Sequence, residues 1–188
     1  MWNTLWTRLK LSLTTLPTQK GWIITTIVIV LSLIILGVIA TMTKFVNPMQ
    51  DYNTFWYKYP QKYMVAFLFP SFLEELFWRG LMLPSTPLEK QPIILSIYCI
   101  VILALHVAVH PIIALVGIWP RGRDVFTDVR FLILATIVLG SATICYVVTN
   151  GSVYAATLAH AIPVILWRDC FHGERRLGFG SSNNNNVE

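Results

Sequence analysis

Charged side chains are scarce in this sequence of 188 residues. Only 12% of the residues are charged, 9 of them acidic, whereas a typical soluble domain has about 25% charged residues. Hydrophobic residues make up 55% of the chain, and the mean hydropathy is +0.63. A water-soluble core cannot bury this much apolar sequence, so the composition excludes an ordinary soluble domain.

Cysteine is also scarce, and its spacing indicates no disulfide framework and no zinc knuckle. Cys99 and Cys145 fall inside apolar runs, Cys170 lies near the end of another, and no CxxC pair occurs. The net charge of +5 is spread along the chain without a basic block. This pattern argues against nucleic acid as a partner, and a lipid bilayer surface accounts for it.

Long hydrophobic runs dominate the sequence instead. Five of them approach the roughly 17–25 residues that cross a bilayer as a helix. They are continuous rather than alternating, which favours helices over a β-barrel. We therefore predict an all-α fold, a polytopic transmembrane helix bundle of about five spans with a buried polar site. The predicted spans are Trp22–Met42, Tyr63–Leu83, Pro92–Ile118, Phe131–Val148 and Val153–Trp167.

The predicted bundle forms one domain over residues 22–170. Residues 1–21 form a basic leader, and the polar tail over residues 171–188, with four consecutive asparagines, is predicted to be disordered. A cleaved signal peptide is the alternative for the first run, but the length of that run favours a retained anchor. Basic residues fall on both sides of a five-span bundle, so the positive-inside rule leaves the orientation open.

Three ionisable residues, Glu74, Glu75 and Arg79, lie inside the second run. Each costs roughly 2.5–3.5 kcal/mol at the centre of a membrane helix, which makes them functional candidates. On a helix, Glu75 and Arg79 lie one turn apart on one face and can pair, while Glu74 points about 100° away from Glu75. The pattern therefore predicts one structural carboxylate and one that is available for chemistry.

Three of the four histidines also fall in apolar runs. His106 and His110 lie one turn apart in the third run, and His160 lies in the fifth. We expect these helices to converge on the carboxylates. A buried carboxylate beside a histidine can activate water, and a second histidine can donate a hydrogen bond to the oxyanion that forms. A structural Glu–Arg pair with interhelical histidine hydrogen bonds is the alternative.

Two segments and a late histidine resemble the motifs of the CPBP family, the CAAX-protease and bacteriocin-processing (Abi-type) intramembrane proteases. Glu74-Glu75-Leu76-Phe77-Trp78-Arg79-Gly80 resembles the EExxxR motif. His106-Val107-Ala108-Val109-His110 resembles the FxxxH motif, with histidine where phenylalanine is usual. His160 matches a histidine of a late helix. The resemblance extends from about Phe67 to Trp167.

This resemblance implies an intramembrane endopeptidase that hydrolyses membrane-associated protein or peptide substrates with a glutamate-activated water. Val164 stands where better-known members have an asparagine that shares the oxyanion hole, and His106 leaves open which histidine of its motif assists the base. The implied roles are Glu74 as the base, His110 as its partner, Glu75 and Arg79 as a supporting pair, and His160 as the oxyanion stabiliser.

Other functions and a metal remain as alternatives. Val164 favours a catalytically inactive membrane binding or immunity protein of the same fold, whereas the lack of inverted repeats disfavours a proton-coupled transporter. The glutamate mechanism requires no cofactor, although zinc could be held by His106, His110, His160 and Glu74. Nothing in the sequence identifies a groove for prenylated C-termini. The implied location is a prokaryotic plasma membrane or a thylakoid-like membrane.

Overall fold

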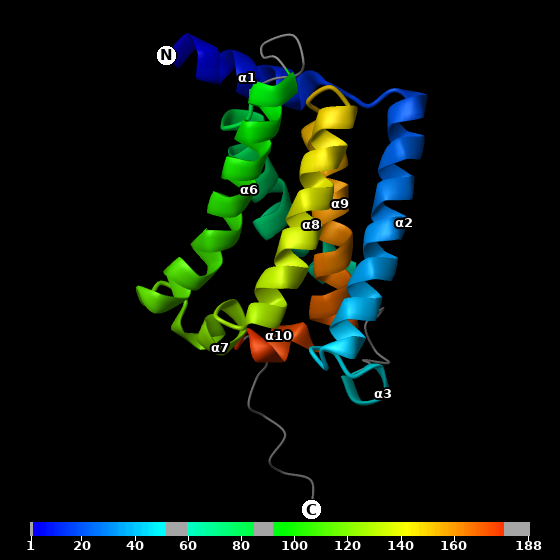
Figure 1. Cartoon of the computed structure of the whole chain (residues 1–188), viewed down its shortest axis with the longest axis vertical. Coiled ribbons are helices and arrows are strands. Elements are labelled where there is room, and N and C mark those ends of the chain that lie inside the picture. Colours follow the sequence, from blue (N-terminus) through cyan, green and yellow to red (C-terminus); the bar gives the residue numbers. More distant parts are fainter. Residues whose placement is uncertain (1, 52–59, 85–91, 179–188) are drawn as a thin grey trace, which may run out of the picture.

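The computed structural model describes residues 2–51, 60–84 and 92–178, and these residues form helices and no strands. Helix α1 (Trp2–Thr14) crosses one end of an upright bundle (Figure 1). The predicted all-α transmembrane bundle is thereby confirmed. The upright helices are α2 (Gln19–Met42), α6 (Pro92–Leu115), α8 (Val129–Val148) and α9 (Val153–Ile165), and the short helices at the other end are α3 (Pro48–Asp51), α7 (Arg123–Phe126) and α10 (Gly173–Arg176).

Three of these helices, α2, α6 and α8, are long and apolar enough to cross a membrane. Their ends lie within three residues of the predicted spans. The start of α2 is fixed by Thr18, whose hydroxyl accepts a hydrogen bond from the Gly21 N–H at 3.1 Å, and Asp128 caps α8 in the same way. Large apolar side chains such as Ile23 and Ile27 are exposed on α2, as expected for a helix surface in contact with lipid.

The second predicted span is interrupted, which corrects the expectation of one regular helix over residues 63–83. Phe69 has φ −128° and ψ 120°, because a residue before proline avoids the helical region and Pro70 has no N–H for the helical ladder. The segment consists of α4 (Pro60–Ala66), the π-helical η2 (Phe67–Phe72), α5 (Leu73–Glu75) and the π-helical η3 (Leu76–Leu81).

The fifth predicted span is likewise composite. Helix α9 has 13 residues and continues as the π-helical η5 (Leu166–Cys170). A tight turn with positive φ at Asn150 and Gly151 joins it to α8. Small residues on α9, including Ala155, Ala156 and Ala159, are fully buried in the apolar core, and they let the neighbouring helices approach closely.

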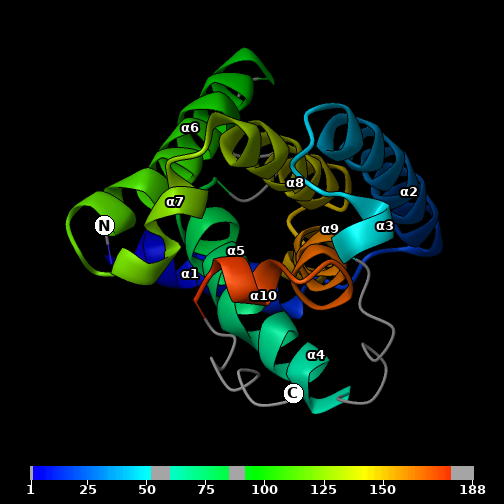
Figure 2. The same cartoon turned by 90° about the horizontal axis from the view of Figure 1, so that it is seen from below.

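The segment predicted to be a disordered tail begins in an ordered conformation. Glu174 of α10 accepts a hydrogen bond from the Lys62 ammonium at 3.0 Å, and the Arg176 guanidinium donates to the Phe45 carbonyl at 2.8 Å. These contacts tie α10 to the start of α4 and to the segment after α2, at the end of the bundle that faces the viewer in Figure 2. Residues 179–188 of the predicted tail lie outside the described residues.

The tertiary structure provides a basis for the orientation that the sequence left open. At the end that carries α1, the described basic residues are Arg8, Lys10 and Lys20. More basic residues collect at the opposite end, because the C-terminal segment folds back against the loops there. They are Lys44, Lys62, Arg121, Arg123, Arg130, Arg168, Arg175 and Arg176.

By the positive-inside rule, we expect the α10 end to face the cytoplasm. The measurement is labelling with a membrane-impermeant thiol reagent in sealed vesicles of known sidedness. Arg175→Cys and Lys10→Cys would be compared in a chain whose three native cysteines are replaced by serine. Arg175→Cys should react only from the cytoplasmic side, and Lys10→Cys only from the other side. The reverse pattern would contradict this orientation.

Candidate active site

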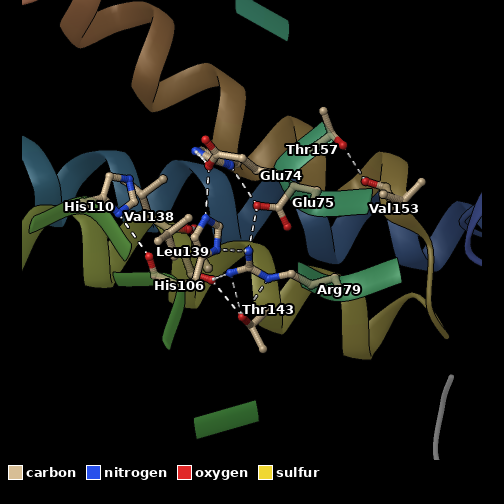
Figure 3. A network of polar contacts seen from close by, with 12 residues as sticks. Glu74, Glu75, Arg79, His106, His110, Val138, Leu139, Thr143, Val153 and Thr157 are labelled. Carbon is tan, nitrogen blue, oxygen red and sulfur yellow. Dashed lines mark hydrogen bonds and ion pairs between the residues drawn. The ribbon is translucent and has the colours of Figure 1, made fainter. Parts of the chain in front are cut away.

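The interrupted segment carries both carboxylates of the site and its arginine. Helix α5 holds Glu74 and Glu75, and η3 holds Arg79. π-Helical turns are rare in proteins and are frequently found at functional sites. Figure 3 shows that these side chains meet polar groups from α6, α8 and α9, so the predicted convergence of helices is observed.

Arg79 is the centre of the hydrogen-bond network. Its side chain is 0% exposed, yet each of its three nitrogens has partners (Figure 3). Nη1 donates to Glu75 Oε1 at 2.9 Å and to His106 Nδ1 at 2.7 Å. Nη2 donates to the Leu139 carbonyl at 2.6 Å, and Nε and Nη2 donate to the Thr143 hydroxyl at 3.3 and 3.1 Å. The buried charge is therefore both neutralised and fully hydrogen-bonded.

The two adjacent carboxylates have different surroundings. Glu75 is 0% exposed, and its Oε1 accepts hydrogen bonds from both Arg79 and His160 Nδ1, the latter at 2.8 Å. Glu74 is 32% exposed, and its Oε2 lies 3.1 Å from His106 Nε2. The predicted pairing of Glu75 with Arg79 is confirmed, and Glu74 is not bonded to the arginine.

The tautomer of His106 follows from its neighbours. An arginine can only donate, so His106 Nδ1 must be the unprotonated nitrogen that accepts from Arg79. We therefore assign the hydrogen to Nε2, which donates it to Glu74 Oε2. The structure thus brings His106 against Glu74, whereas the resemblance implied His110 as the partner.

The other two histidines have the opposite tautomer. His110 Nδ1 faces the backbone carbonyls of His106 and Val107 at 3.1 and 3.3 Å, so Nδ1 carries its hydrogen. His160 Nδ1 donates to Glu75. Its Nε2 lies 4.0 Å from Glu74 Oε2, which is too long for a direct hydrogen bond. Both residues therefore have an unprotonated Nε2 when their imidazoles are neutral.

A large cavity reaches the site. Its volume is about 910 Å³, and Glu74, His110 and His160 contribute to its wall together with Val164. Most of the remaining lining is apolar and aromatic, whereas Lys62, Arg168 and Glu174 at its α10 end are charged. The cavity therefore connects a small polar cluster within the bundle with the end that we expect to face the cytoplasm.

The zinc alternative does not fit the described residues well. No group of three His, Cys, Asp or Glu side chains among residues 2–51, 60–84 and 92–178 has an arrangement that could hold a metal ion. Both nitrogens of His106 are occupied, one by Arg79 and one by Glu74, which removes one of the four ligands considered from the sequence.

Two residues of the network were not singled out from the sequence. Thr143 accepts from Arg79 and donates to the Leu139 carbonyl at 2.8 Å, and Trp78 stacks on His106 with ring centroids 4.8 Å apart. A hydroxyl in the middle of an apolar run is a weak signal, because threonine in a membrane helix usually bonds to its own backbone. Trp78 could have been noticed from its place next to Arg79.

The fold and the site together define a class of protein: a helical integral membrane protein with a carboxylate–histidine–arginine site beside an apolar cavity. The chain belongs to the Rce1-like type II CAAX prenyl endopeptidase family, whose model matches residues 56–165, in agreement with the resemblance to CPBP proteases. Membership supports a CAAX-type intramembrane protease with membrane-associated substrates. No curated protein and no solved structure matches the chain.

Replacing Arg79 should destabilise the fold strongly. Arg79→Met leaves the fully buried Glu75 carboxylate without its counter-charge, and breaking a buried pair costs about 3–5 kcal/mol. Thermal unfolding of the purified protein in detergent measures this loss. Arg123→Met, at an exposed position of α7, serves as the control.

The double variant Glu75→Leu/Arg79→Met should recover part of the lost stability, since it removes both charges. Equal melting temperatures for Arg79→Met and the wild type would show that the buried Glu75–Arg79 pair does not stabilise the fold as expected.

Proposed function

We propose that this protein is an intramembrane endopeptidase that hydrolyses a peptide bond of a membrane-associated protein with a water molecule activated by Glu74. One observation carries this proposal: of the two adjacent carboxylates, only Glu74 reaches the cavity. Glu74 is 32% exposed there, whereas Glu75 is 0% exposed and bonded to Arg79 and His160. Family membership supports the class of reaction.

In the proposed reaction Glu74 accepts a proton from water as the water oxygen bonds to the carbonyl carbon of the substrate. The electron pair of the C=O double bond moves to the carbonyl oxygen and gives a tetrahedral oxyanion. As the intermediate collapses, the C–N bond breaks and Glu74 returns the proton to the leaving nitrogen. The products are a carboxylic acid, which ionises, and an amine, and the sequence of steps requires no cofactor.

His160 is the proposed oxyanion stabiliser. Its Nε2 lies 4.0 Å from Glu74 Oε2, so a substrate carbonyl attacked beside Glu74 would lie within reach of this imidazole. Because Nδ1–H already donates to Glu75, Nε2 can donate to the oxyanion only when the ring is doubly protonated. His110 lines the same cavity, and its unprotonated Nε2 is proposed to accept a hydrogen bond from the water or the substrate.

The proposed substrate is a protein or peptide that presents an apolar segment from the bilayer. The mainly apolar cavity wall supports such a segment, and the charged residues at its α10 end, Lys62, Arg168 and Glu174, suit the polar part of a chain that leaves the membrane. A prokaryotic plasma membrane or a thylakoid-like membrane is the proposed location.

A membrane binding or immunity protein without activity is the second candidate. The observation that favours it is Val164, which lies one helical turn after His160 and presents an apolar side chain to the cavity. No hydrogen-bond donor is supplied there, and loss of one oxyanion donor lowers turnover by about 10²–10³-fold.

Glu74→Gln should abolish proteolysis and leave the fold intact, because an amide cannot accept the proton from water. The measurement compares the terminal peptides of membrane proteins from cells with wild-type protein or the variant. Asp124→Asn is the matched control, since it makes the same carboxylate-to-amide change at an exposed position of α7 outside the cavity lining.

New protein termini that require Glu74 but not Asp124 would support the protease and identify a substrate. If a substrate cleaved by the wild type were cleaved equally by a stably folded Glu74→Gln protein, Glu74 would not be the base.

Val164→Asn distinguishes the two candidate functions. In an active protease, an added amide donor beside His160 should raise kcat, by up to about 10²–10³-fold if it binds the oxyanion directly. The rate of cleavage of a substrate found by the terminal-peptide comparison measures this. Val164→Leu, which keeps an apolar side chain, is the control. A gain in Val164→Leu equal to that in Val164→Asn would rule out the hydrogen-bond explanation.

A further inference from the structure

His106 lies directly behind Glu74 and is held on several sides. It is 0% exposed. The Trp78 ring stacks on it with ring centroids 4.8 Å apart and an angle of 17°, and the His110 ring lies 5.9 Å away at 21°. Both of its nitrogens are engaged, one by Arg79 and one by Glu74 (Figure 3). The imidazole therefore has one orientation in the site.

We propose that His106 is a positioning residue, which holds Glu74 as a hydrogen-bonded carboxylate facing the cavity, and that Arg79 fixes the tautomer that this requires. The inference rests on the proposed function of Glu74 as the base. The contacts that carry it are Arg79 Nη1 to His106 Nδ1 at 2.7 Å and His106 Nε2 to Glu74 Oε2 at 3.1 Å.

The direction of these hydrogen bonds decides what His106 can do. Arg79 occupies the lone pair of Nδ1, so His106 cannot take a proton from water without losing that contact. Nε2–H can donate only to an acceptor, and a carboxylate that receives a hydrogen bond is favoured in its ionised form. His106 thus keeps Glu74 ready to accept a proton and limits its rotation.

This arrangement is a departure from the motif that the chain resembles. A phenylalanine, which is usual at this position, could stack on Trp78 but could neither accept from Arg79 nor donate to Glu74. In this protein the same position supplies a donor to the base. Arg79 consequently supports both carboxylates, Glu75 directly and Glu74 through His106.

The first test measures the ionisation of Glu74 without using proteolysis. Dicyclohexylcarbodiimide reacts with protonated carboxyl groups in apolar surroundings, and mass spectrometry of the full-length protein in detergent gives the rate of labelling at Glu74. The variants are His106→Phe, which keeps a stacking ring, and His106→Gln, whose amide can accept from Arg79 and donate to Glu74. Glu174, whose carboxylate is paired with Lys62, should stay unlabelled and is the internal control for selectivity.

His106→Phe should label Glu74 at least about tenfold faster than the wild type at the same neutral pH, since a hydrogen bond to a charged group is worth about one power of ten or more. His106→Gln should label at close to the wild-type rate. The charged and titratable neighbours Glu75, Arg79, His110 and His160 are unchanged in every variant, so they do not account for a difference.

Two results would overturn the proposal. One is wild-type labelling of Glu74 in a folded His106→Phe protein. The other is equally fast labelling in His106→Gln and His106→Phe. If His106 acted only through packing, an amide with the same donor and acceptor would not restore the slow labelling of Glu74.

A second measurement keeps the test decisive if His106→Phe does not fold. In the wild-type protein with ¹⁵N-labelled histidine, the His106 resonances, assigned by their loss in His106→Gln, should show a neutral ring with the hydrogen on Nε2 around neutral pH. His110 should show the hydrogen on Nδ1. A His106 ring that is doubly protonated, or that carries its hydrogen on Nδ1, would refute the assignment.

These outcomes separate the inference from the proposed function. If the labelling and the tautomer are as expected but Glu74→Gln still cleaves substrate, His106 positions Glu74 and Glu74 is not the base. If Glu74→Gln is inactive but His106→Phe changes neither labelling nor kcat, Glu74 is the base and His106 does not position it. In the expected case His106→Phe lowers kcat about tenfold or more with little change in KM, and His106→Gln restores it.

Discussion

The arrangement of the site depends on the burial of one positive charge, the Arg79 guanidinium. A charge within the bundle is tolerated only if it is paired and all of its hydrogen-bond donors find acceptors. Arg79 meets this condition with groups from three elements: Glu75 one turn before it, His106 on α6, and the Leu139 carbonyl and Thr143 hydroxyl on α8. Satisfying the arginine therefore fixes the distances between these helices at the level of the site.

The same constraint gives the two neighbouring glutamates different surroundings. Glu75 neutralises Arg79 and accepts a hydrogen bond from His160, and it is fully buried. Glu74 remains at the wall of the cavity, where its carboxylate lies next to His106 Nε2. The irregular backbone contributes as well, because the break at Phe69 and Pro70 and the π-helical turns allow this acidic segment to depart from a regular helix. The small residues of α9 let His160 come close enough to bond to Glu75 and to lie 4.0 Å from Glu74.

Much of this could be predicted from the sequence, for reasons that are local. Apolar runs of sufficient length specify membrane helices, and the spacing of Glu75 and Arg79 places them one turn apart whatever else the chain does. Pro70 is also a sequence signal for the interruption of the second span. The long apolar run around this proline nevertheless favoured the prediction of one continuous helix. The ordered start of the C-terminal segment was not predictable from its composition, because α10 is held by contacts with Lys62 and Phe45, which are distant in the sequence.

The sequence by itself determined the fold class and the chemical groups of the candidate site. The tertiary structure decided how those groups are paired. His106 and His110 lie on one side of α6, and helical spacing alone cannot tell which of them meets Glu74. That choice depends on the rotation of α6 about its axis, which is set by Arg79 and by the stacking of Trp78 on His106. Spacing along a chain fixes neighbours within a helix, whereas contacts between helices depend on the packing of the whole bundle.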